Sequence, residues 1–145
     1  MDFFAHRKSA RRILALWFLR LPTDRLQRKA RGENPLVVAQ KIDNALCLSA
    51  VDLAAAKIGL RPGMTLADAR ARVLALDVAE ADEIADRKLL EAIAEWCDRF
   101  TPFVAIDAPH GLFLDITGAA HLFGGERGLL ERVEKDITRQ GFALR

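Results

Sequence analysis

The stretch from Ile106 to Gly118 constrains the fold more than any other part of this chain. Short apolar runs at 103–106 and 112–116 lie on either side of a Pro-His-Gly turn, which predicts a β-hairpin. Over 83–100, directly before it, apolar residues recur at helical spacing and acids occupy the other side, which predicts an amphipathic helix. A long helix followed by a hairpin predicts an α+β domain, with helices packed on a mixed β-sheet.

Shorter signals predict the other elements. Asp52 is expected to cap the N-terminus of one helix, and Thr65 with Asp68 resembles a capping box before a second one. We expect these two helices to form a small helical subdomain inserted between strands of the sheet. Residues 142–145 resemble the start of a further strand. The predicted strands are 13–19, 36–39, 45–51 and 74–78, and the predicted helices besides 83–100 are 22–30, 53–58, 66–73 and 126–140.

Composition and apolar runs limit the class of protein. Hydrophobic residues make up 51% of the 145 residues, which is typical of a folded domain with a core. The longest apolar run, Ile13 to Leu19, is too short to span a bilayer, so we expect a cytoplasmic protein with no membrane partner. Cys47 and Cys97 lie far apart in apolar contexts, which favours free thiols, and no ligand spacing indicates a structural zinc site.

Charge is segregated along the chain. Residues 1–32 carry nine Lys or Arg and two acids, whereas residues 77–98 carry eight acids and two basic residues. We expect residues 1–11 to form a basic flexible leader. The basic start either contacts nucleic-acid phosphates or is an ordinary solvated surface. The candidate DNA-binding residues are Arg11, Arg12, Arg25, Arg28 and Lys29.

Three segments together resemble the Y-family translesion DNA polymerases. They are the apolar strand from Ile13 to Leu19, the stretch from Ala50 to Met64, which is similar to that family's finger element, and Leu112 to Gly118, which is similar to its palm strand. The resemblance covers about residues 12–145. It implies an incomplete Y-family polymerase fold: a UmuC-like palm-and-fingers domain with its fingers at about 40–78, ending before the rest of the palm, the thumb and the little finger.

Other segments are similar to the ImuB-like branch of that family. They are Arg12 to Phe18, Trp96 to Pro102 and Asp115 to Glu126, of which the last is the most specific. This resemblance implies a bacterial, nucleoid-associated adaptor in DNA repair, translesion synthesis and the mutagenesis of the SOS response to DNA damage. The partners that it implies are DNA, a RecA-like accessory protein, an error-prone replicative-type DNA polymerase and the sliding clamp.

Residues that active family members use for catalysis are replaced here. Polymerase chemistry needs carboxylates that hold two divalent metal ions. Where the resemblance places these acids, this chain has Ala15 and Trp17 on the first strand and His110 and Gly111 at the hairpin turn. The finger positions that match the nucleotide-binding Tyr and Arg are Leu53 and Ala56. The resemblance therefore implies a pseudoenzyme with no bound metal, no nucleotide site and no cofactor.

Two alternatives stay open. One is an active DNA-directed DNA polymerase that requires Mg²⁺ and uses Asp107 and Asp115 as substitute acids, although local backbone hydrogen bonds are the simpler explanation of both. The other is a small basic DNA-binding domain. Among the ring-bearing residues, we interpret Trp17 and Phe18 as core residues rather than base-stacking groups, His110 as exposed and His121 as packed.

Overall fold

The predicted hairpin lies in a three-stranded antiparallel sheet, which we call the hairpin sheet. In this computed structural model, which describes residues 10–145, β5 (Val104–Asp107) and β6 (Gly111–Asp115) form the hairpin. β1 (Ile13–Trp17) pairs antiparallel with β6, so the strand order is β1-β6-β5. The hairpin predicted from the sequence is therefore confirmed.

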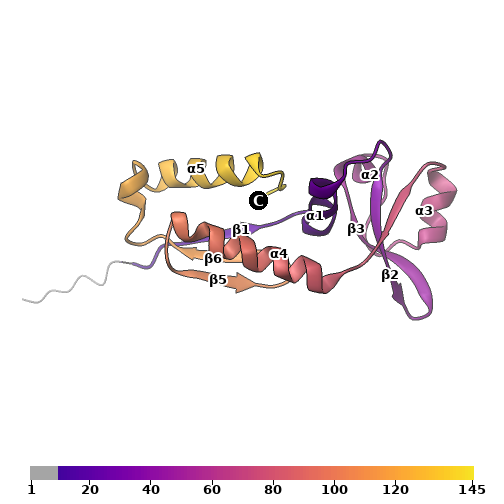
Figure 1. Cartoon of the computed structure of the whole chain (residues 1–145), viewed down its shortest axis with the longest axis horizontal. Coiled ribbons are helices and arrows are strands. Elements are labelled where there is room, and N and C mark those ends of the chain that lie inside the picture. Colours follow the sequence, from indigo (N-terminus) through magenta and orange to yellow (C-terminus); the bar gives the residue numbers. More distant parts are fainter. Residues whose placement is uncertain (1–9) are drawn as a thin grey trace, which may run out of the picture.

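A second three-stranded sheet, the insertion sheet, lies between β1 and β5 in the sequence and in a separate lobe of the molecule (Figure 1). Its central strand, β2 (Leu36–Ile42), is antiparallel to β3 (Ala45–Val51) and parallel to β4 (Asp77–Glu80). The α+β class is confirmed. The expectation of one mixed sheet with a helical insertion is corrected, because within residues 10–145 the insertion carries a sheet of its own and the parallel pairing lies in that sheet.

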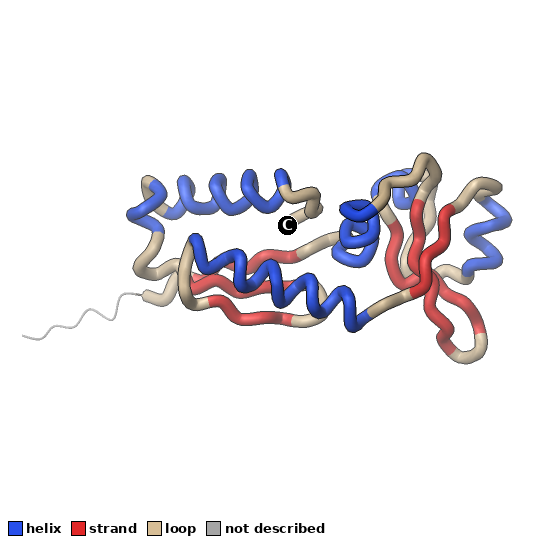
Figure 2. Tube along the Cα trace, in the orientation of Figure 1, coloured by secondary structure: helices blue, strands red, loops and turns tan. Residues whose placement is uncertain are grey.

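The helices divide between the two lobes (Figures 1 and 2). α4 (Glu83–Trp96), continued by the 3-10 turn Cys97–Arg99, and α5 (Glu126–Arg139) cover one face of the hairpin sheet. α1 (Leu21–Lys29) lies at the junction of the lobes, and α2 (Leu53–Lys57) and α3 (Leu66–Arg72) belong to the insertion. A short 3-10 turn, Ala120–Phe123, leads into α5.

Strand alternation places one set of side chains under α4 and α5. Leu16, Leu112 and Leu114 are buried there in one apolar cluster with residues of both helices. Burial of each of these leucines stabilises the fold by about 2 kcal/mol. On α5, Leu129, Val133 and Ile137 face this cluster, whereas Leu130 is 43% exposed.

The insertion has its own small core and confirmed helix caps. The Asp52 carboxylate accepts the Ala55 N–H at 2.7 Å at the start of α2, and the Thr65 hydroxyl accepts the Asp68 N–H at 3.2 Å at the start of α3. The predicted strand at 74–78 begins later, at β4, because Leu74 is fully exposed in a loop.

The first strand is not buried along its whole length. Its residues alternate, so that Ile13 is 51% exposed and Trp17 is 44% exposed while Leu16 is buried. The interpretation of Trp17 as a core residue was therefore wrong. Phe18 is completely buried and its ring meets that of Phe142 at 5.8 Å, as expected of a core residue.

Residues at the end of the chain extend the hairpin sheet beyond β1. Trp17 and Arg145 exchange two backbone hydrogen bonds of 2.8 Å, and Phe18 is bridged to Leu144. The buried Asp24 carboxylate accepts the Ala143 N–H at 2.9 Å, which fastens this segment to α1. The strand start expected at 142–145 is therefore paired with the sheet.

Several single-residue expectations have clear outcomes. Cys47 and Cys97 are both free thiols, and burial raises the pKa of Cys97 to about 11. His121 is exposed, so the expectation of a packed histidine was wrong.

Of the basic leader 1–11, residues 1–9 lie outside the described residues. No helix within residues 10–145 is both long and apolar enough to cross a membrane.

Candidate functional site

Three of the four positions that the sequence resemblance matches to metal-binding acids lie on the face of the hairpin sheet that α4 and α5 leave uncovered, which we call the open face. The strand register fixes which residues share it. One row across the sheet holds Asp107, Gly111 and Trp17, and the next holds Ala105, Phe113 and Ala15. Ala15, Trp17 and Gly111 therefore share one surface, although 94 positions separate Trp17 from Gly111 in the sequence. None of the three side chains carries an oxygen that could bind a hard cation.

His110 lies at the turn, beside this row. Its ring meets the Trp17 ring edge-on, with centroids 5.6 Å apart, and its carbonyl accepts the Phe18 N–H at 2.8 Å. The imidazole is half-buried and its Nδ1 atom is enclosed without a hydrogen-bond partner, so the expectation of an exposed histidine was wrong. His110 also borders a cavity of about 320 Å³ between the two lobes, whose other polar lining residues are Gln40, Ser49, Glu83, Asp86 and Arg87.

Asp107 and Asp115, the expected substitute acids, are held apart by the strand between them. Asp107 pairs with Gly111 at one end of β6, whereas Asp115 pairs with Ile13 at the other. Four residues of extended chain separate the two ends, a distance of about 13 Å. Among residues 10–145, no group of three His, Cys, Asp or Glu side chains is placed to hold a metal ion.

Asp115 has local partners that account for its position. Its carboxylate accepts the Thr117 hydroxyl at 2.6 Å and the Thr117 N–H at 3.1 Å, and lies 3.5 Å from the Arg11 guanidinium. The Thr117 hydrogen bonds, with a smaller effect of Arg11, hold the pKa of Asp115 below its usual range. The explanation of Asp115 by local backbone hydrogen bonds is therefore confirmed.

The two finger positions lie on α2, away from the open face. Leu53 is 49% exposed beside a hollow that is also lined by Arg20 and Arg31, and Ala56 is exposed on the next turn. Asp52 joins α2 to α1 by accepting a hydrogen bond of 2.8 Å from Gln27. Neither Leu53 nor Ala56 offers a charge or a hydroxyl to a triphosphate.

The candidate DNA-binding residues do not form one basic surface. Arg11 and Arg12 lie at the start of β1, whereas Arg25, Arg28 and Lys29 lie on α1, which follows its other end. Arg12 makes two hydrogen bonds of 2.6 and 2.7 Å with Glu126, and half-buried Arg25 makes one of 2.6 Å with Asp86. These two guanidinium groups are engaged within the fold, which weakens the interpretation of a basic DNA-binding stripe.

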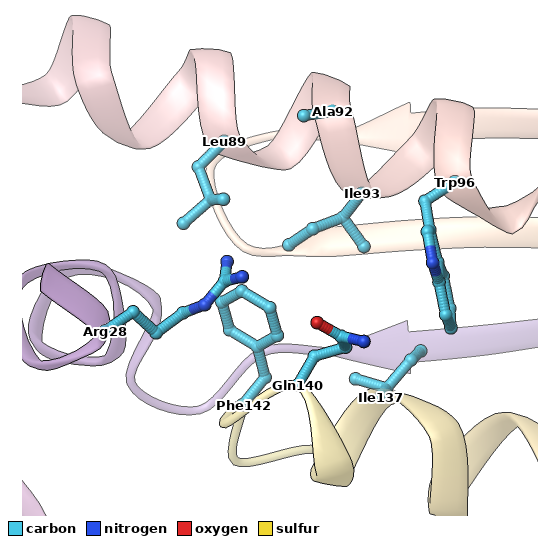
Figure 3. Close-up of a pocket in the computed structure, with 8 residues that line it drawn as sticks. All are labelled: Arg28, Leu89, Ala92, Ile93, Trp96, Ile137, Gln140 and Phe142. Atoms are coloured by element: carbon cyan, nitrogen blue, oxygen red, sulfur yellow. The ribbon is translucent and has the colours of Figure 1, made fainter.

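Arg28 also has an intramolecular partner. Its guanidinium lies over the Phe142 ring at 4.7 Å and points into a cavity of about 160 Å³ between α1, α4 and α5 (Figure 3). Leu89, Ile93 and Trp96 give this cavity mainly apolar walls. Arg25 is the one member of the set that is not exposed, whereas Arg11, Arg12, Arg28 and Lys29 all keep exposed surface.

Comparison with known proteins identifies the family of this chain. A sequence model described as IMS, the impB/mucB/samB family, matches residues 23–142. The chain belongs to this family. Protein ImuB from two strains of Caulobacter vibrioides, NA1000 / CB15N and ATCC 19089 / CIP 103742 / CB 15, is 50% identical over 88 residues, which cover 61% of this chain and 19% of ImuB.

Solved structures establish the fold of this family member. DinB from Sulfolobus solfataricus superimposes with a TM-score of 0.73 at 13% identity, and the insertion ternary complex of Dbh DNA polymerase superimposes with 0.74 at 14% identity. Each comparison covers 92% of this chain and 41% of the solved one. The resemblance to Y-family polymerases is thus confirmed at the level of fold, and the chain spans about a fifth of ImuB and two fifths of the solved polymerases.

Sequence reasoning missed two residues of the open face, Phe103 and Phe113. They are 69% and 42% exposed. The alternation within 111–115 shows that Phe113 is opposite to Leu112 and Leu114, but the sequence does not show which set faces the helices. That assignment requires the register between β1 and β6, which joins residues about 100 positions apart.

Proposed function

We propose that this chain is the palm-and-fingers portion of a non-catalytic Y-family polymerase homologue that acts as an adaptor in DNA repair, translesion synthesis and damage-induced mutagenesis. One observation carries the proposal. The chain has the polymerase fold, but Ala15, Trp17 and Gly111 on the open face and His110 beside it occupy the positions where metal-binding acids are expected. Without carboxylates the site lacks the groups that hold two metal ions against a triphosphate.

The substitute acids do not supply what is missing. Two metal ions in such a site lie about 3.5–4 Å apart and need shared carboxylates. Asp107 and Asp115 lie at opposite ends of β6, and Asp115 is already bound to Thr117 and Arg11. This geometry supports the adaptor over the alternative of an active, Mg²⁺-dependent polymerase.

The wider role rests on the similarity to ImuB. By analogy we propose that the protein works on DNA at the bacterial nucleoid, in the cytoplasm, within the SOS response. Its proposed partners are a RecA-like accessory protein, an error-prone replicative-type polymerase and the sliding clamp. The 50% identity over 88 residues supports this assignment, and the similarity of the fold to DNA polymerases supports DNA as a ligand.

Primer extension tests the absence of catalysis. The purified chain, incubated with a primed template, all four dNTPs and Mg²⁺ or Mn²⁺, is expected to add no nucleotide above the level of a buffer control. The double variant Asp107→Asn/Asp115→Asn should behave in the same way. Extension by the wild type that this double variant abolishes would overturn the proposal.

A genetic test addresses the adaptor role. Deletion of the gene in its source bacterium should lower the frequency of damage-induced mutation, because the partner polymerase then lacks its adaptor. The gene carrying Asp107→Asn and Asp115→Asn should restore wild-type mutation frequency, because these acids have no catalytic task. Failure of that allele, with normal protein levels, would indicate an enzyme.

A further inference from the structure

Three exposed aromatic side chains cross the open face as a diagonal. Trp17 lies on β1, and Phe113 lies on β6 one row along, opposite Ala15. Phe103 precedes β5 and continues its ladder, because its carbonyl accepts the Asp115 N–H at 2.9 Å. Phe103 therefore has the same orientation as Ala105, opposite Phe113. Neighbours on such a diagonal lie about 7 Å apart, within reach of aromatic rings. We call this set the aromatic diagonal.

Small residues flank the aromatic diagonal and leave its rings accessible. Gly111 and Ala15 lie beside Trp17 and Phe113, and Ala105 lies beside Phe113 on the other strand. The exposed fractions are 44% for Trp17, 42% for Phe113 and 69% for Phe103. The row of Phe103 holds the larger residues Asp115 and Ile13. The exposed fractions nevertheless show that each ring can present area to a flat ligand.

The backbone beneath the aromatic diagonal is fixed by hydrogen bonds. The buried Thr101 hydroxyl donates to the Asp115 carbonyl at 2.6 Å and accepts the Phe103 N–H at 3.3 Å. Trp17 is held by its backbone pair with Arg145 and by the edge of the His110 ring. Rings on a rigid support lose little conformational freedom when they bind a ligand.

A guanidinium group lies at each end of this surface. The Arg11 side chain is 82% exposed and offsets the charge of Asp115, 3.5 Å away. Arg145 is exposed and pairs with Trp17 in the row that also contains Gly111 and Asp107. The Asp107 carboxylate, at the far corner of that row, is an acid on this face that would repel a phosphate.

We propose that the aromatic diagonal stacks unpaired bases of single-stranded DNA, with the Arg11 and Arg145 guanidinium groups contacting its phosphates. Aromatic rings on the open face of an antiparallel sheet stack splayed bases well, because every base has a π-face. The choice of DNA rests on the proposed function. Spaced rings with a guanidinium group at each end match a chain of bases and phosphates better than they match a protein helix, which would present a continuous apolar stripe.

Fluorescence measurements test this inference directly. The chain contains two tryptophans, so Trp96→Phe leaves Trp17 as the sole tryptophan. Adding a short oligo(dT) strand should quench its emission. In anisotropy titrations with the same labelled strand, Trp17→Ala and Phe113→Ala should each weaken binding about fivefold or more. Leu130→Ala, an exposed residue on α5, is the matched control and should leave affinity unchanged.

Charge and strandedness sharpen the test. Arg11→Ala should weaken binding and reduce the slope of log affinity against log salt by about one. Asp107→Asn should strengthen binding, because it removes a repulsive charge from the face. A duplex of equal length should bind more weakly than the single strand, since its bases cannot reach the rings.

Three results would overturn the inference. They are unchanged affinity in both Trp17→Ala and Phe113→Ala, equal binding of duplex and single strand, and self-association of the chain that these variants abolish without any effect on DNA. Circular dichroism must first show that each variant keeps the wild-type fold. The titrations contain no dNTP or Mg²⁺, so a negative result in them does not bear on the proposed absence of catalysis. Primer extension activity would overturn that proposal alone and would leave the stacking of bases on the aromatic diagonal to be judged by the titrations.

Discussion

The two faces of the hairpin sheet are built from alternating residues of the same strands, yet one face packs against helices and the other is exposed. The face under α4 and α5 carries Leu16, Leu112 and Leu114, and its packing supports a fold shared with polymerases at 13–14% identity. The open face carries Ala15, Trp17, Gly111 and Phe113. The comparison teaches that the covered face supplies the packing of the polymerase-like fold, while the residues of the open face contribute little to that core.

The largest effect should come from the covered face. Leu112→Ala removes a fully buried side chain and should lower the free energy of unfolding by about 2–5 kcal/mol. Its neighbour Phe113 points to the open face, so Phe113→Ala should cost only about 0.5 kcal/mol. Urea denaturation measures both. Equal losses for the two variants would show that the faces do not differ in the way described.

The next effect concerns Asp24, where the covered face meets α1. Asp24→Ala leaves the Ala143 N–H without its acceptor and should cost about 1–3 kcal/mol. Asp24→Asn keeps an oxygen in place and is the matched control. If both variants unfold with the same free energy as the wild type, the hydrogen bond between Asp24 and Ala143 does not stabilise the fold.

Asp24 also predicts a pH dependence. Burial raises the pKa of its carboxyl, although the Ala143 hydrogen bond opposes this. The folded chain therefore holds this proton more tightly than the unfolded chain does. The Asp24 contribution to stability should be largest at acid pH and decrease as pH rises through the folded-state pKa. Asp24→Asn should lack this decrease in thermal or urea unfolding measured across pH 3–7, the range about the usual Asp pKa of about 3.9.

A smaller effect is expected on the open face, at Gly111. A Cβ atom there would lie 3.1 Å from the Asp107 carbonyl oxygen, which is closer than ordinary contact. Gly111→Ala should therefore cost about 1 kcal/mol. At Gly118 nothing lies within 4 Å, so Gly118→Ala is the control and should be nearly neutral. A neutral Gly111→Ala would mean that the open face has room for a larger residue at the matched acid position.

The smallest effect belongs to Asp115. Thr117 and Arg11 keep its pKa low, so its contribution to stability is present above the ordinary Asp pKa and is lost as pH falls through the folded-state value. Asp115→Asn should therefore flatten the acid limb of the stability curve and leave that curve unchanged in shape above about pH 5. An unaltered acid limb would show that the contacts to Thr117 and Arg11 do not persist in solution.

Local signals predicted much of the fold. Helical periodicity located α4 and α5, and the caps at Asp52 and Thr65 were correct because they depend on residues three positions apart. The insertion sheet was missed because the pairing of β2 with β4 joins distant segments in parallel. Such pairing leaves no trace in local composition.

The site was harder to predict than the fold. The resemblance predicted Ala15, Trp17, His110 and Gly111 as the positions matched to metal-binding acids, and the register brings Ala15, Trp17 and Gly111 onto one surface with His110 beside them. Trp17 was misassigned to the core because the run Ile13 to Leu19 is apolar on both faces, so its period does not reveal an exposed side. The number of basic residues free to contact DNA was overestimated, because the sequence does not show that Glu126 and Asp86 bind Arg12 and Arg25.

Manganese binding, followed by electron paramagnetic resonance of the free ion, tests the central claim most directly. The account predicts that the chain, with or without a dNTP, leaves Mn²⁺ free at concentrations at which a carboxylate-lined polymerase site would be filled. Stoichiometric binding of one or two Mn²⁺ ions that is lost in Asp107→Asn or Asp115→Asn would contradict it, because the open face would then hold the metals that its residues are argued to lack.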